Sequence, residues 1–292
     1  MNPAGLTGQV AVVTGAASGL GRGSALRLAA EGCSVIAVDI DEPGLTTLSQ
    51  ARAESDGEIL TVTADVSDPA QVDAYIKAGV TQFGRIDLHH LNAGIFGTFA
   101  PLPDLAVEEF DRVQAVNVRG QFLGLRAAFR RYREQRSSGA VVLTASIASL
   151  TGSADLIAYQ TSKHATLGLV RGGAMFGGPL GIRVNGVAPG IVPTELFAAA
   201  AGESGGKNDM RHRASTTPLR RAGTPQDIAG VTAFLLSDDA AYVTGQIVSA
   251  DGGATIVNTV RPSGGAGAWS TDELDFATYG EWLQKEEVSR EQ

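Results

Sequence analysis

Short apolar runs rich in β-branched residues alternate with longer runs of helical periodicity along most of the chain. The first apolar run covers residues 9–14, and a helical pattern through Leu20, Ala25 and Leu28 follows it. The same order recurs, with strands predicted at 9–14, 34–39, 58–63, 86–91, 139–146, 182–188 and 246–249, and helices at 69–83, about 104–133 and about 158–176. Such alternation predicts an α/β fold, with a doubly wound, seven-stranded parallel sheet and helices on both faces.

Length and composition favour one domain. The 292 residues are 43% hydrophobic and 18% charged, which is enough for one large core. A net charge of -8 argues against a nucleic-acid partner and against an anionic membrane surface. The chain has no apolar run of membrane-spanning length, and residues 1–8 lack the parts of a signal peptide, so we expect a cytoplasmic protein. The single cysteine, Cys33, excludes an intramolecular disulfide and a cysteine-based metal site, and we expect it to be a small buried hydrophobe.

A glycine-rich turn follows the first predicted strand, with the spacing Gly15-x-x-x-Gly19-x-Gly21. Glycines at such a turn let the backbone approach a pyrophosphate, and the free N–H groups of the following helix hold its charge. The spacing differs from the usual dinucleotide fingerprint, and a plain strand-to-helix turn is the alternative interpretation. The second predicted strand ends in Asp39, about twenty residues further on, where recognition of a ribose needs an acid. Together the two features favour a Rossmann-like dinucleotide site.

Asp39 also discriminates between the two nicotinamide dinucleotides. A carboxylate accepts hydrogen bonds from the ribose hydroxyls but repels a 2′-phosphate, and neither Ile40 nor Asp41 supplies a compensating cation. We therefore expect NAD as the cofactor rather than NADP.

Tyr159 and Lys163 lie four residues apart in a run that is predicted to be helical, so they share one face. A nearby ammonium favours phenolate over phenol, and it would pull the pKa of Tyr159 down from about 10. The pair would then act as a general acid or base, although Tyr–Lys pairs are also common on exposed helices. Ligands gather at the carboxyl ends of parallel strands. The residues expected to converge there are the glycine turn, Asp39, Asn92, Ser146, Pro189 and Gly190.

In combination these motifs resemble the classical short-chain dehydrogenase/reductase family over residues 6–254. The glycine turn has the cofactor spacing of that family, Asn92-Ala93-Gly94 matches its central-strand motif, and residues 189–194 match its nicotinamide-side loop. The resemblance implies no metal and four catalytic residues: Asn117, Ser146, Tyr159 and Lys163. It implies cofactor contacts from Gly15, Ser18, Gly19, Leu20, Gly21, Asp39, Ile40, Asp65, Val66, Asn92, Ala93, Gly94, Tyr159, Lys163, Pro189, Gly190, Val192 and Thr194.

The resemblance also implies hydride transfer between nicotinamide and a small-molecule substrate, a secondary alcohol or its ketone. Tyr159 would move the hydroxyl proton, and Ser146 would orient the oxygen. Lys163 would bind the nicotinamide ribose and depress the pKa of Tyr159, while Asn117 would hold a water molecule. Two alternatives stay open: a 3-oxoacyl-carrier-type ketone reductase, and a non-catalytic NAD-sensing protein on the same scaffold. Relatives usually form homotetramers, so a homo-oligomer, either a tetramer or a dimer, is expected.

Three features stand out: one departs from the family pattern, one places polar residues in a buried strand, and one is a loop beside the expected site. Leu91 stands where the family commonly has an asparagine. His89 and His90 interrupt a strand that should be buried on both faces, and we expect core histidines with satisfied hydrogen bonds rather than a functional pair. Residues 191–217 should form a mobile substrate lid, in which the basic run 211–213 is more typical of a solvated face than of an anion site.

The chain continues past residue 254 into an extension, 255–292, that is longer than in most family members. Residues 270–273 resemble a capping box, and Phe276, Tyr279 and Leu283 would share one helical face. A short helix at 270–285 is therefore expected to dock on a neighbouring subunit, with a frayed terminus as the alternative. The expected organisation is one domain, 1–254, with its lid, followed by the extension.

Overall fold

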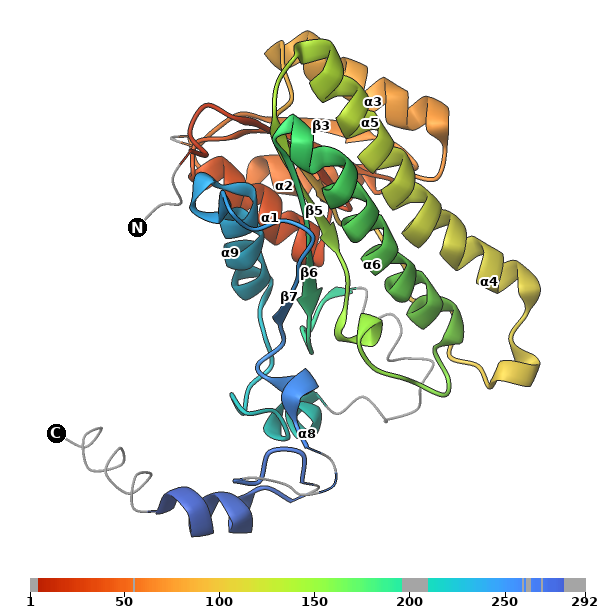
Figure 1. Cartoon of the computed structure of the whole chain (residues 1–292), viewed down its shortest axis with the longest axis vertical. Helices are drawn as coiled ribbons and strands as arrows, with labels where there is room; N and C mark the ends of the chain where they lie inside the picture. The colour runs from red at the N-terminus through yellow and green to blue at the C-terminus, as the bar shows by residue number, and fades with distance from the viewer. Residues whose placement is uncertain are drawn as a thin grey trace, which may run out of the picture.

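The computed structural model describes residues 5–54, 56–195, 210–258, 260, 264–268 and 270–280. In this part of the chain one seven-stranded sheet has the order β3-β2-β1-β4-β5-β6-β7, and every neighbouring pair is parallel (Figure 1). The strands are β1 (Val10–Thr14), β2 (Ser34–Asp39), β3 (Ile59–Thr63), β4 (Leu88–Leu91), β5 (Gly139–Thr144), β6 (Ile182–Pro189) and β7 (Ile247–Ala250). The predicted doubly wound parallel sheet is confirmed.

The strands are apolar because helices cover the sheet on both faces. All five residues of β1 and the four central residues of β2 are buried. The predicted strand ends lie within two residues of the observed ones. The prediction that β5 runs to Ser146 is wrong, because the Ser146 hydroxyl accepts a hydrogen bond from Ala148 N at 3.1 Å and begins a 3₁₀ turn, η3 (Ile147–Ser149).

Two layers of helices cover the sheet (Figure 1). One layer consists of α1 (Gly19–Ala30), α2 (Glu42–Gln50) and α9 (Pro225–Leu236), and the other includes α3 (Pro69–Phe83), α5 (Gly120–Gln135) and α6 (Ile157–Gly177). Periodicity alone predicts neither α2 nor α9, but both carry local start signals. The Asp41 side chain accepts from Gly44 N, and Thr224 and Asp227 form a capping box. None of the helices in the described ranges is long and apolar enough to cross a membrane.

The predicted helix at 104–133 is not one continuous α-helix. A 3₁₀ turn, η1 (Leu102–Asp104), is followed by α4 (Val107–Gln114), by a π-helical segment, η2 (Ala115–Arg119), and by α5. Within the π-helical segment the Gly120 N–H reaches back five residues to Ala115 O. A pattern of apolar positions cannot reveal this change of hydrogen bonding, because the segment adds one residue without ending the helix.

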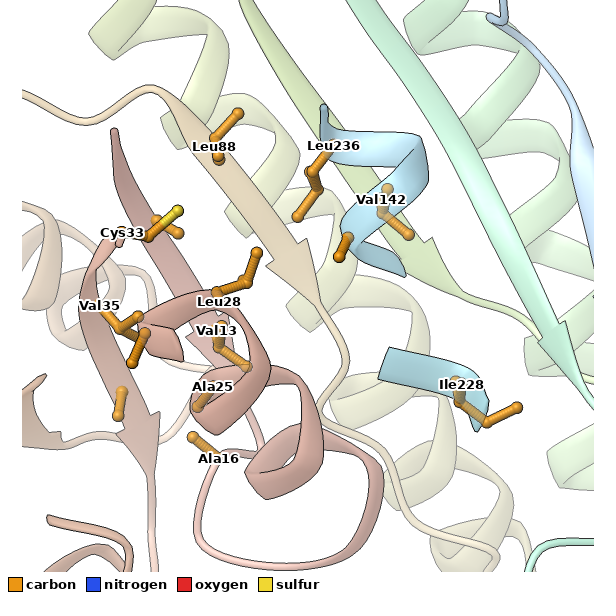
Figure 2. Close-up of a cluster of buried hydrophobic side chains, with 14 of the residues drawn as sticks. Val13, Ala16, Ala25, Leu28, Cys33, Val35, Leu88, Val142, Ile228 and Leu236 are labelled. Carbon is orange, nitrogen blue, oxygen red and sulfur yellow. The ribbon is translucent and has the colours of Figure 1, made fainter. Parts of the chain in front are cut away.

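A cluster of buried hydrophobic side chains fills the layer between the sheet and α1 and α9 (Figure 2). Many of its members come from β1, β2, α1 and α9, among them Val13, Val35, Ala25, Leu28 and Ile228. Cys33 is fully buried in this cluster, and its Sγ contacts Leu6 O at 3.1 Å. Burial raises the pKa of the Cys33 thiol to about 12, so the predicted role as a small buried hydrophobe is confirmed.

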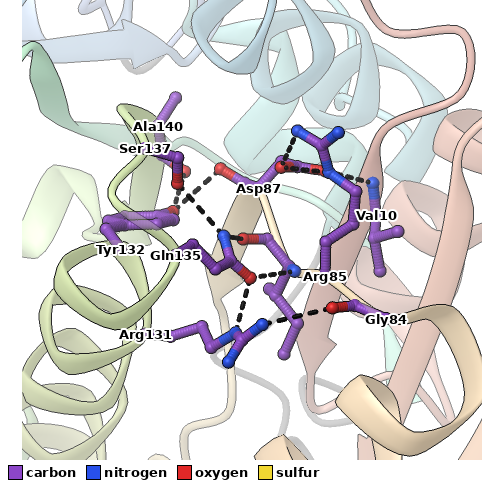
Figure 3. A network of polar contacts seen from close by, with 10 residues as sticks. Val10, Gly84, Arg85, Asp87, Arg131, Tyr132, Gln135, Ser137 and Ala140 are labelled. Atoms are coloured by element: carbon purple, nitrogen blue, oxygen red, sulfur yellow. Dashed lines mark hydrogen bonds and ion pairs between the residues drawn. The ribbon is translucent and has the colours of Figure 1, made fainter.

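A polar network holds the amino ends of the central strands (Figure 3). The Asp87 carboxylate accepts hydrogen bonds from Val10 N at 3.0 Å and from Arg85, whose Nη2 lies 2.7 Å away. Tyr132 Oη donates to Asp87 O at 2.9 Å, and Gln135 bonds both backbone groups of the residue before Asp87. The network joins β1, β4 and α5 at the edge opposite to the carboxyl ends of the strands. It therefore fixes the amino ends of β1 and β4 relative to α5.

The C-terminal extension is tied to the body of the protein by an ion pair. Residues 272–280 are helical, and the Asp275 carboxylate accepts hydrogen bonds of 2.8 and 2.5 Å from the Arg220 guanidinium. Arg220 follows α8 (Met210–Ser215) and has a φ of 53°, a left-handed conformation that is uncommon for a residue with a side chain. Phe276 and Tyr279 are exposed, whereas Leu283 of the predicted apolar face lies outside the described residues.

His89 and His90 are both completely buried in β4. His90 Nε2 lies 2.9 Å from Thr144 Oγ1. His89 packs edge-on against the Tyr132 ring at 5.7 Å, and neither of its ring nitrogens has a hydrogen-bond partner in the described part of the chain. The prediction of satisfied core histidines is therefore wrong for both ring nitrogens of His89, and it is met only in part at His90, whose Nδ1 has no partner in the described part of the chain. Burial lowers the pKa of each histidine to about 3.

These buried histidines should make stability depend on pH. Their folded pKa is lower than the unfolded value of 6.5, so the unfolded chain gains protons first and stability falls as pH drops from 6.5 towards 3. Each histidine contributes at most about 1.4 kcal/mol per pH unit in that window. We expect His89→Leu to raise the Tm at pH 7 and to flatten its decline between pH 6.5 and 4.5. His164→Gln, an exchange on the exposed face of α6, is the control, and an unchanged decline in His89→Leu would contradict the prediction.

Candidate active site

β1 and β4 lie side by side in the sheet, and the chain leaves their carboxyl ends in different directions. A crevice for a ligand opens at such a switch point. Three hydrogen bonds still join the two ends. The Asn92 and Ala93 N–H groups donate to Thr14 Oγ1 at 2.9 and 3.1 Å, and Asn92 Nδ2 donates to Thr14 O at 3.1 Å.

The turn between β1 and α1 has no room for side chains at two of its glycines. A Cβ on Gly15, whose φ is 67°, would lie 2.9 Å from Ala93 Cα. A Cβ on Gly21 would lie 1.9 Å from Gly15 O, so the first turn of α1 sits directly on the loop. Ser18 occupies the N-cap position, and Leu20 packs against the apolar cluster. The result is a close-fitting backbone cradle with the free N–H groups of α1 at its edge, which fits a pyrophosphate.

Asp39 is held beside this cradle. Its carboxylate accepts hydrogen bonds from Ala17 N at 2.9 Å and from Asp41 N at 3.1 Å, and the following residue, Ile40, is exposed. The Arg22 guanidinium donates to Ala17 O on the same turn. The sequence pattern did not predict a role for this cation, although its place directly after Gly21 is a usable signal.

Asp65 lies just beyond β3, one strand further from the switch point than Asp39. Its Oδ1 accepts hydrogen bonds of 2.8 Å from both the N–H and the hydroxyl of Ser67. Val66 is buried, and its Cγ2 would lie 2.8 Å from a Cβ on Gly120. The carboxylate is thus fixed by its own loop at the outer end of the cofactor edge.

Tyr159 and Lys163 lie one turn apart on α6, as predicted, and both are buried, with exposed fractions of 9% and 3%. Lys163 Nζ lies 5.5 Å from the centre of the Tyr159 ring. It donates a hydrogen bond of 2.8 Å to Thr144 O at the end of β5. The ammonium is therefore directed at a backbone carbonyl and not at the phenol oxygen.

The pKa of Tyr159 does not follow the expectation from the sequence. Burial raises the pKa of Tyr159 to about 12, and a hydrogen bond with Ser146 offsets part of this rise. Burial also lowers the pKa of Lys163 to about 8, so this ammonium is still largely charged at pH 7. The expected lowering of the phenol pKa by Lys163 is not met, because removal from water outweighs the cation beside the ring.

Ser146 and a second serine connect β5 to α6. The Ser149 hydroxyl accepts a hydrogen bond from Ser146 N at 3.2 Å and donates to Lys163 O at 2.8 Å. Ser146 is thereby fixed next to Tyr159, even though it lies two residues beyond the strand. Ser149 was not predicted as a site residue, although its position three residues after Ser146 is typical of a capping box.

Asn117 lies in the π-helical segment and is completely buried. Its Oδ1 accepts from Ile95 N at 2.8 Å, and its Nδ2 donates to Ile95 O and to Ser162 Oγ, both at 2.9 Å. The side chain thus fixes the loop after β4 to α6. The resemblance implies that Asn117 holds a water molecule. In this structure its side-chain amide donates both of its hydrogen bonds to protein oxygens, Ile95 O and Ser162 Oγ.

An aromatic side chain lies over the catalytic candidate. The Phe96 ring is 4.5 Å from the Tyr159 ring, and the Phe99 ring lies 6.4 Å beyond Phe96. Both phenylalanines belong to the loop that follows Asn92-Ala93-Gly94. These two aromatic rings could not be predicted beside Tyr159, because nothing in the local pattern shows where the loop turns.

The loop after β6 closes the other side of the cradle. Gly190 N donates to Ala250 O at 3.1 Å, and Val192 is buried. A Cβ on Gly19 would lie 3.2 Å from Thr194, so the structure brings Thr194 to the start of α1. The Glu195 carboxylate accepts a hydrogen bond of 3.0 Å from Gly19 N. A carboxylate thus binds one of the N–H groups that would hold a pyrophosphate.

The central part of the predicted lid, 196–209, and the side chains of Arg211 and His212 lie outside the described residues. Among the residues that the structure does describe, no group of three or more His, Cys, Asp or Glu side chains could hold a metal ion. The groups that the structure describes at this edge are a phenol, an ammonium, hydroxyls and the glycine cradle.

Comparison with known proteins agrees with this geometry. A family profile described as enoyl-(acyl carrier protein) reductase matches residues 15–255. The chain is 42% identical over 252 residues to levodione reductase from Leifsonia aquatica, which covers 85% of this chain and 94% of that protein. The crystal structure of levodione reductase matches with a TM-score of 0.83 and covers 86% of this chain and 99% of that chain.

Two further structural neighbours were crystallised with a nicotinamide cofactor. NAD+-bound xylitol dehydrogenase is 33% identical, with a TM-score of 0.80, over 85% of this chain and 100% of that chain. A 3-ketoacyl-(acyl-carrier-protein) reductase from Brucella melitensis, complexed with NADH, is 31% identical, with a TM-score of 0.77, over 85% of this chain and 98% of that chain.

The contact between Glu195 and Gly19 should oppose the binding of a dinucleotide. A carboxylate near the start of a helix competes with a pyrophosphate for the same N–H groups and repels its charge. We expect Glu195→Gln to lower the Kd for NADH by about two- to fivefold, as an exposed charge near a helix end would. Fluorescence titration measures this, with Glu134→Gln on the exposed side of α5 as the matched control. Unchanged or weaker binding by Glu195→Gln would show that the contact is irrelevant to the cofactor.

Proposed function

The chain belongs to the classical short-chain dehydrogenase/reductase family and is an oxidoreductase of CH–OH groups, and from this premise we propose that it transfers a hydride between NAD and a secondary alcohol or its ketone. The observation that carries the proposal is the buried group of Tyr159, Lys163 and Ser146 at the same edge as the glycine cradle. A site that only senses a dinucleotide has no need of a phenol and an ammonium buried beside a serine hydroxyl.

Each residue has a distinct part in the proposed reaction. The bound nicotinamide supplies or accepts the hydride. Tyr159 gives its phenolic proton to the carbonyl oxygen during reduction and takes the hydroxyl proton during oxidation. Ser146 directs its hydroxyl to the same oxygen, and its hydrogen bond offsets part of the rise that burial causes in the pKa of Tyr159. Lys163 provides a positive charge 5.5 Å from the ring, which stabilises the phenolate that forms during reduction. Asn117 fixes the loop that carries Ile95 and holds α6 in place through Ser162.

The cofactor would be bound along one continuous edge. Gly15, Gly19 and Gly21 admit its pyrophosphate, while Asp39 and Asp65 face its adenosine half. Further contacts would come from Ser18, Leu20, Ile40, Val66, Asn92, Ala93, Gly94, Pro189, Gly190, Val192 and Thr194. NAD is favoured over NADP because the Asp39 carboxylate, fixed by two backbone N–H groups, is an acceptor for hydroxyls and a source of repulsion for a phosphate.

The substrate would have an apolar carbon body. The Phe96 ring against Tyr159 and Phe99 behind it present an aromatic surface where the carbon next to the reacting oxygen must lie. Among the relatives, 3beta-hydroxysteroid dehydrogenase 2 from Eggerthella lenta is 34% identical and cyclohexanol dehydrogenase from Acinetobacter is 34% identical. Their names support hydrophobic alcohols as the substrate class.

A ketone reductase of acyl-carrier substrates is the second candidate, supported by the resemblance to the Brucella melitensis enzyme and by the description of the family profile. That neighbour was crystallised with NADH, so cofactor choice alone does not separate the candidates. Activity on free hydrophobic alcohols, without a carrier-linked thioester, distinguishes the first candidate from the second.

Purified protein should form NADH from NAD and hydrophobic secondary alcohols, and Tyr159→Phe should abolish this turnover. The change removes the hydroxyl that carries the proton and leaves the cradle intact, so kcat should fall by at least about 100-fold while the Kd for NADH changes little. Tyr242→Phe, at a fully exposed tyrosine, is the control. A Tyr159→Phe variant that keeps more than about a tenth of the wild-type kcat would exclude Tyr159 as the acid/base.

Cofactor preference should depend on Asp39. Wild-type protein should have the higher kcat/KM with NAD, and Asp39→Ala should raise the NADP-to-NAD ratio by about tenfold, because repulsion is lost and the Arg22 cation on the same turn remains. Asp41→Ala, at the N-cap of α2, tests whether any nearby carboxylate has the same effect. A wild-type preference for NADP would overturn the assignment.

We also propose that the chain forms a homo-oligomer through the outer faces of α5 and α6. Phe122, Met175 and Phe176 are exposed there, and Phe176 packs against Phe129 at 5.6 Å. Light scattering should give at least twice the mass of one chain. The double change Met175→Glu and Phe176→Glu should lower that mass, whereas Thr46→Glu on the exposed side of α2 should not. A wild-type protein that runs as a single chain would refute the oligomer.

A further inference from the structure

His90 takes part in a chain of side-chain hydrogen bonds that ends at the cofactor turn. Its Nε2 lies 2.9 Å from Thr144 Oγ1, and Thr144 Oγ1 lies 3.0 Å from Asn92 Oδ1. Asn92 Nδ2 in turn lies 3.1 Å from Thr14 O and 3.4 Å from Gly15 O. These hydrogen bonds start at His90 in the middle of the sheet and end at Gly15, the first residue of the glycine cradle.

The direction of every proton in this chain follows from its two ends. Thr14 O and Gly15 O can only accept, so the Asn92 atom facing them is the amide nitrogen and its oxygen faces Thr144. That oxygen can only accept, so the single hydroxyl proton of Thr144 is given to Asn92. Thr144 must then accept from the imidazole. His90 is therefore a neutral ring with its proton on Nε2, while its Nδ1 is buried without a partner in the described part of the chain.

We propose that His90 is a positioning residue of the cofactor site, which orients Asn92 through the Thr144 hydroxyl and so holds the β1–α1 turn. The proposal rests on the proposed function. His90 touches neither the cofactor nor the substrate edge; it removes the rotational freedom of one hydroxyl. With that hydroxyl fixed, the Asn92 amide keeps its nitrogen on the turn and its oxygen on β5.

The packing around the turn makes this orientation matter. The Asn92 Nδ2 atom would lie only 2.9 Å from a Cβ on Gly15 and 2.7 Å from one on Gly21, so the amide fills the space that the glycines leave. If the amide turned over, its oxygen would face two carbonyl oxygens, which is repulsive. Leu91, the last residue of β4 and the one before Asn92, is apolar and cannot make the hydrogen bonds of the Asn92 amide.

Thr144 also connects this chain of hydrogen bonds, the His90 relay, to Lys163. Its backbone oxygen accepts from Lys163 Nζ at 2.8 Å and from Gln121 Nε2 at 3.1 Å, while its side chain belongs to the relay. One residue at the end of β5 thus fixes the cofactor turn with its hydroxyl and the ammonium with its carbonyl. A shift of Thr144 would be felt at both places.

The proton position gives a direct test. In full-length protein labelled with 15N-histidine, the imidazole nitrogen shifts of His90, assigned by comparison with His90→Gln, should show a protonated Nε2 and a bare Nδ1 at pH 7. The opposite tautomer would break the relay at its first bond and overturn the proposal.

The effect on the cofactor site gives a second test. We expect His90→Leu and Thr144→Val each to raise the Kd for NADH by about five- to tenfold, as the loss of one buried hydrogen bond would. The double variant should bind no more weakly than either single variant, because both changes break the same chain. His90→Gln, which keeps an N–H donor near the Nε2 position, should restore the Kd to within about twofold of wild type.

The matched control is His89→Leu, the same exchange at the next residue of the same strand but on the opposite face of the sheet. It should leave the Kd for NADH unchanged. A folded His90→Leu variant with the wild-type Kd, or a His90→Gln variant as weak as His90→Leu, would refute the relay. Wild-type protein that binds no NADH would instead refute the proposed function, and the tautomer measurement separates the two failures.

Discussion

The positive charge of Lys163 is the constraint on which the architecture of the site depends. An ammonium that is 3% exposed has lost nearly all of its water, and it needs fixed oxygen partners to remain charged at neutral pH. Thr144 O, at the last residue of β5, supplies one such partner. Gln121 donates to the same oxygen, and Ser149 donates to the backbone oxygen of the lysine itself. These two side chains therefore fix the position of the oxygen that accepts from the ammonium and the backbone of the lysine itself.

Much of this arrangement could be predicted from the sequence, because it depends on short-range patterns. Strands buried on both faces are short apolar runs, and their ends are visible to within two residues. The rule that ligands bind at the carboxyl ends of parallel strands then places Asp39, Asn92 and Ser146 at one edge without any knowledge of their contacts. The resemblance to a known family adds the roles proposed for Tyr159 and Lys163, because periodicity alone would leave them as an ordinary helical pair.

The rest could not be predicted, because it depends on what the tertiary fold places next to each group. The pKa of Tyr159 is set by burial, which a spacing of four residues does not reveal. Whether a ring nitrogen of a core histidine has a hydrogen-bond partner depends on one residue of a neighbouring strand. His90 Nε2 lies beside the Thr144 hydroxyl, whereas His89 packs nearly at right angles to the Tyr132 ring and its nitrogens have no partner among the described residues. Glu195 reaches Gly19 across 176 positions of sequence, and no local pattern indicates such a contact.

The π-helical segment Ala115–Arg119 limits how this chain can change in length. It carries one residue more than an α-helix of the same rise, and that surplus turns Asn117 towards Ile95 and Ser162 while α5 still faces the sheet. Deleting one residue here would restore regular α-helical bonding, which is locally favourable, and the flanking helices would keep nearly the same faces because the wider turn already absorbs the surplus residue. The side chain at position 117 would then lose its direction towards Ile95 and Ser162. Descendants of this sequence can therefore exchange residues in the segment far more readily than they can lose one.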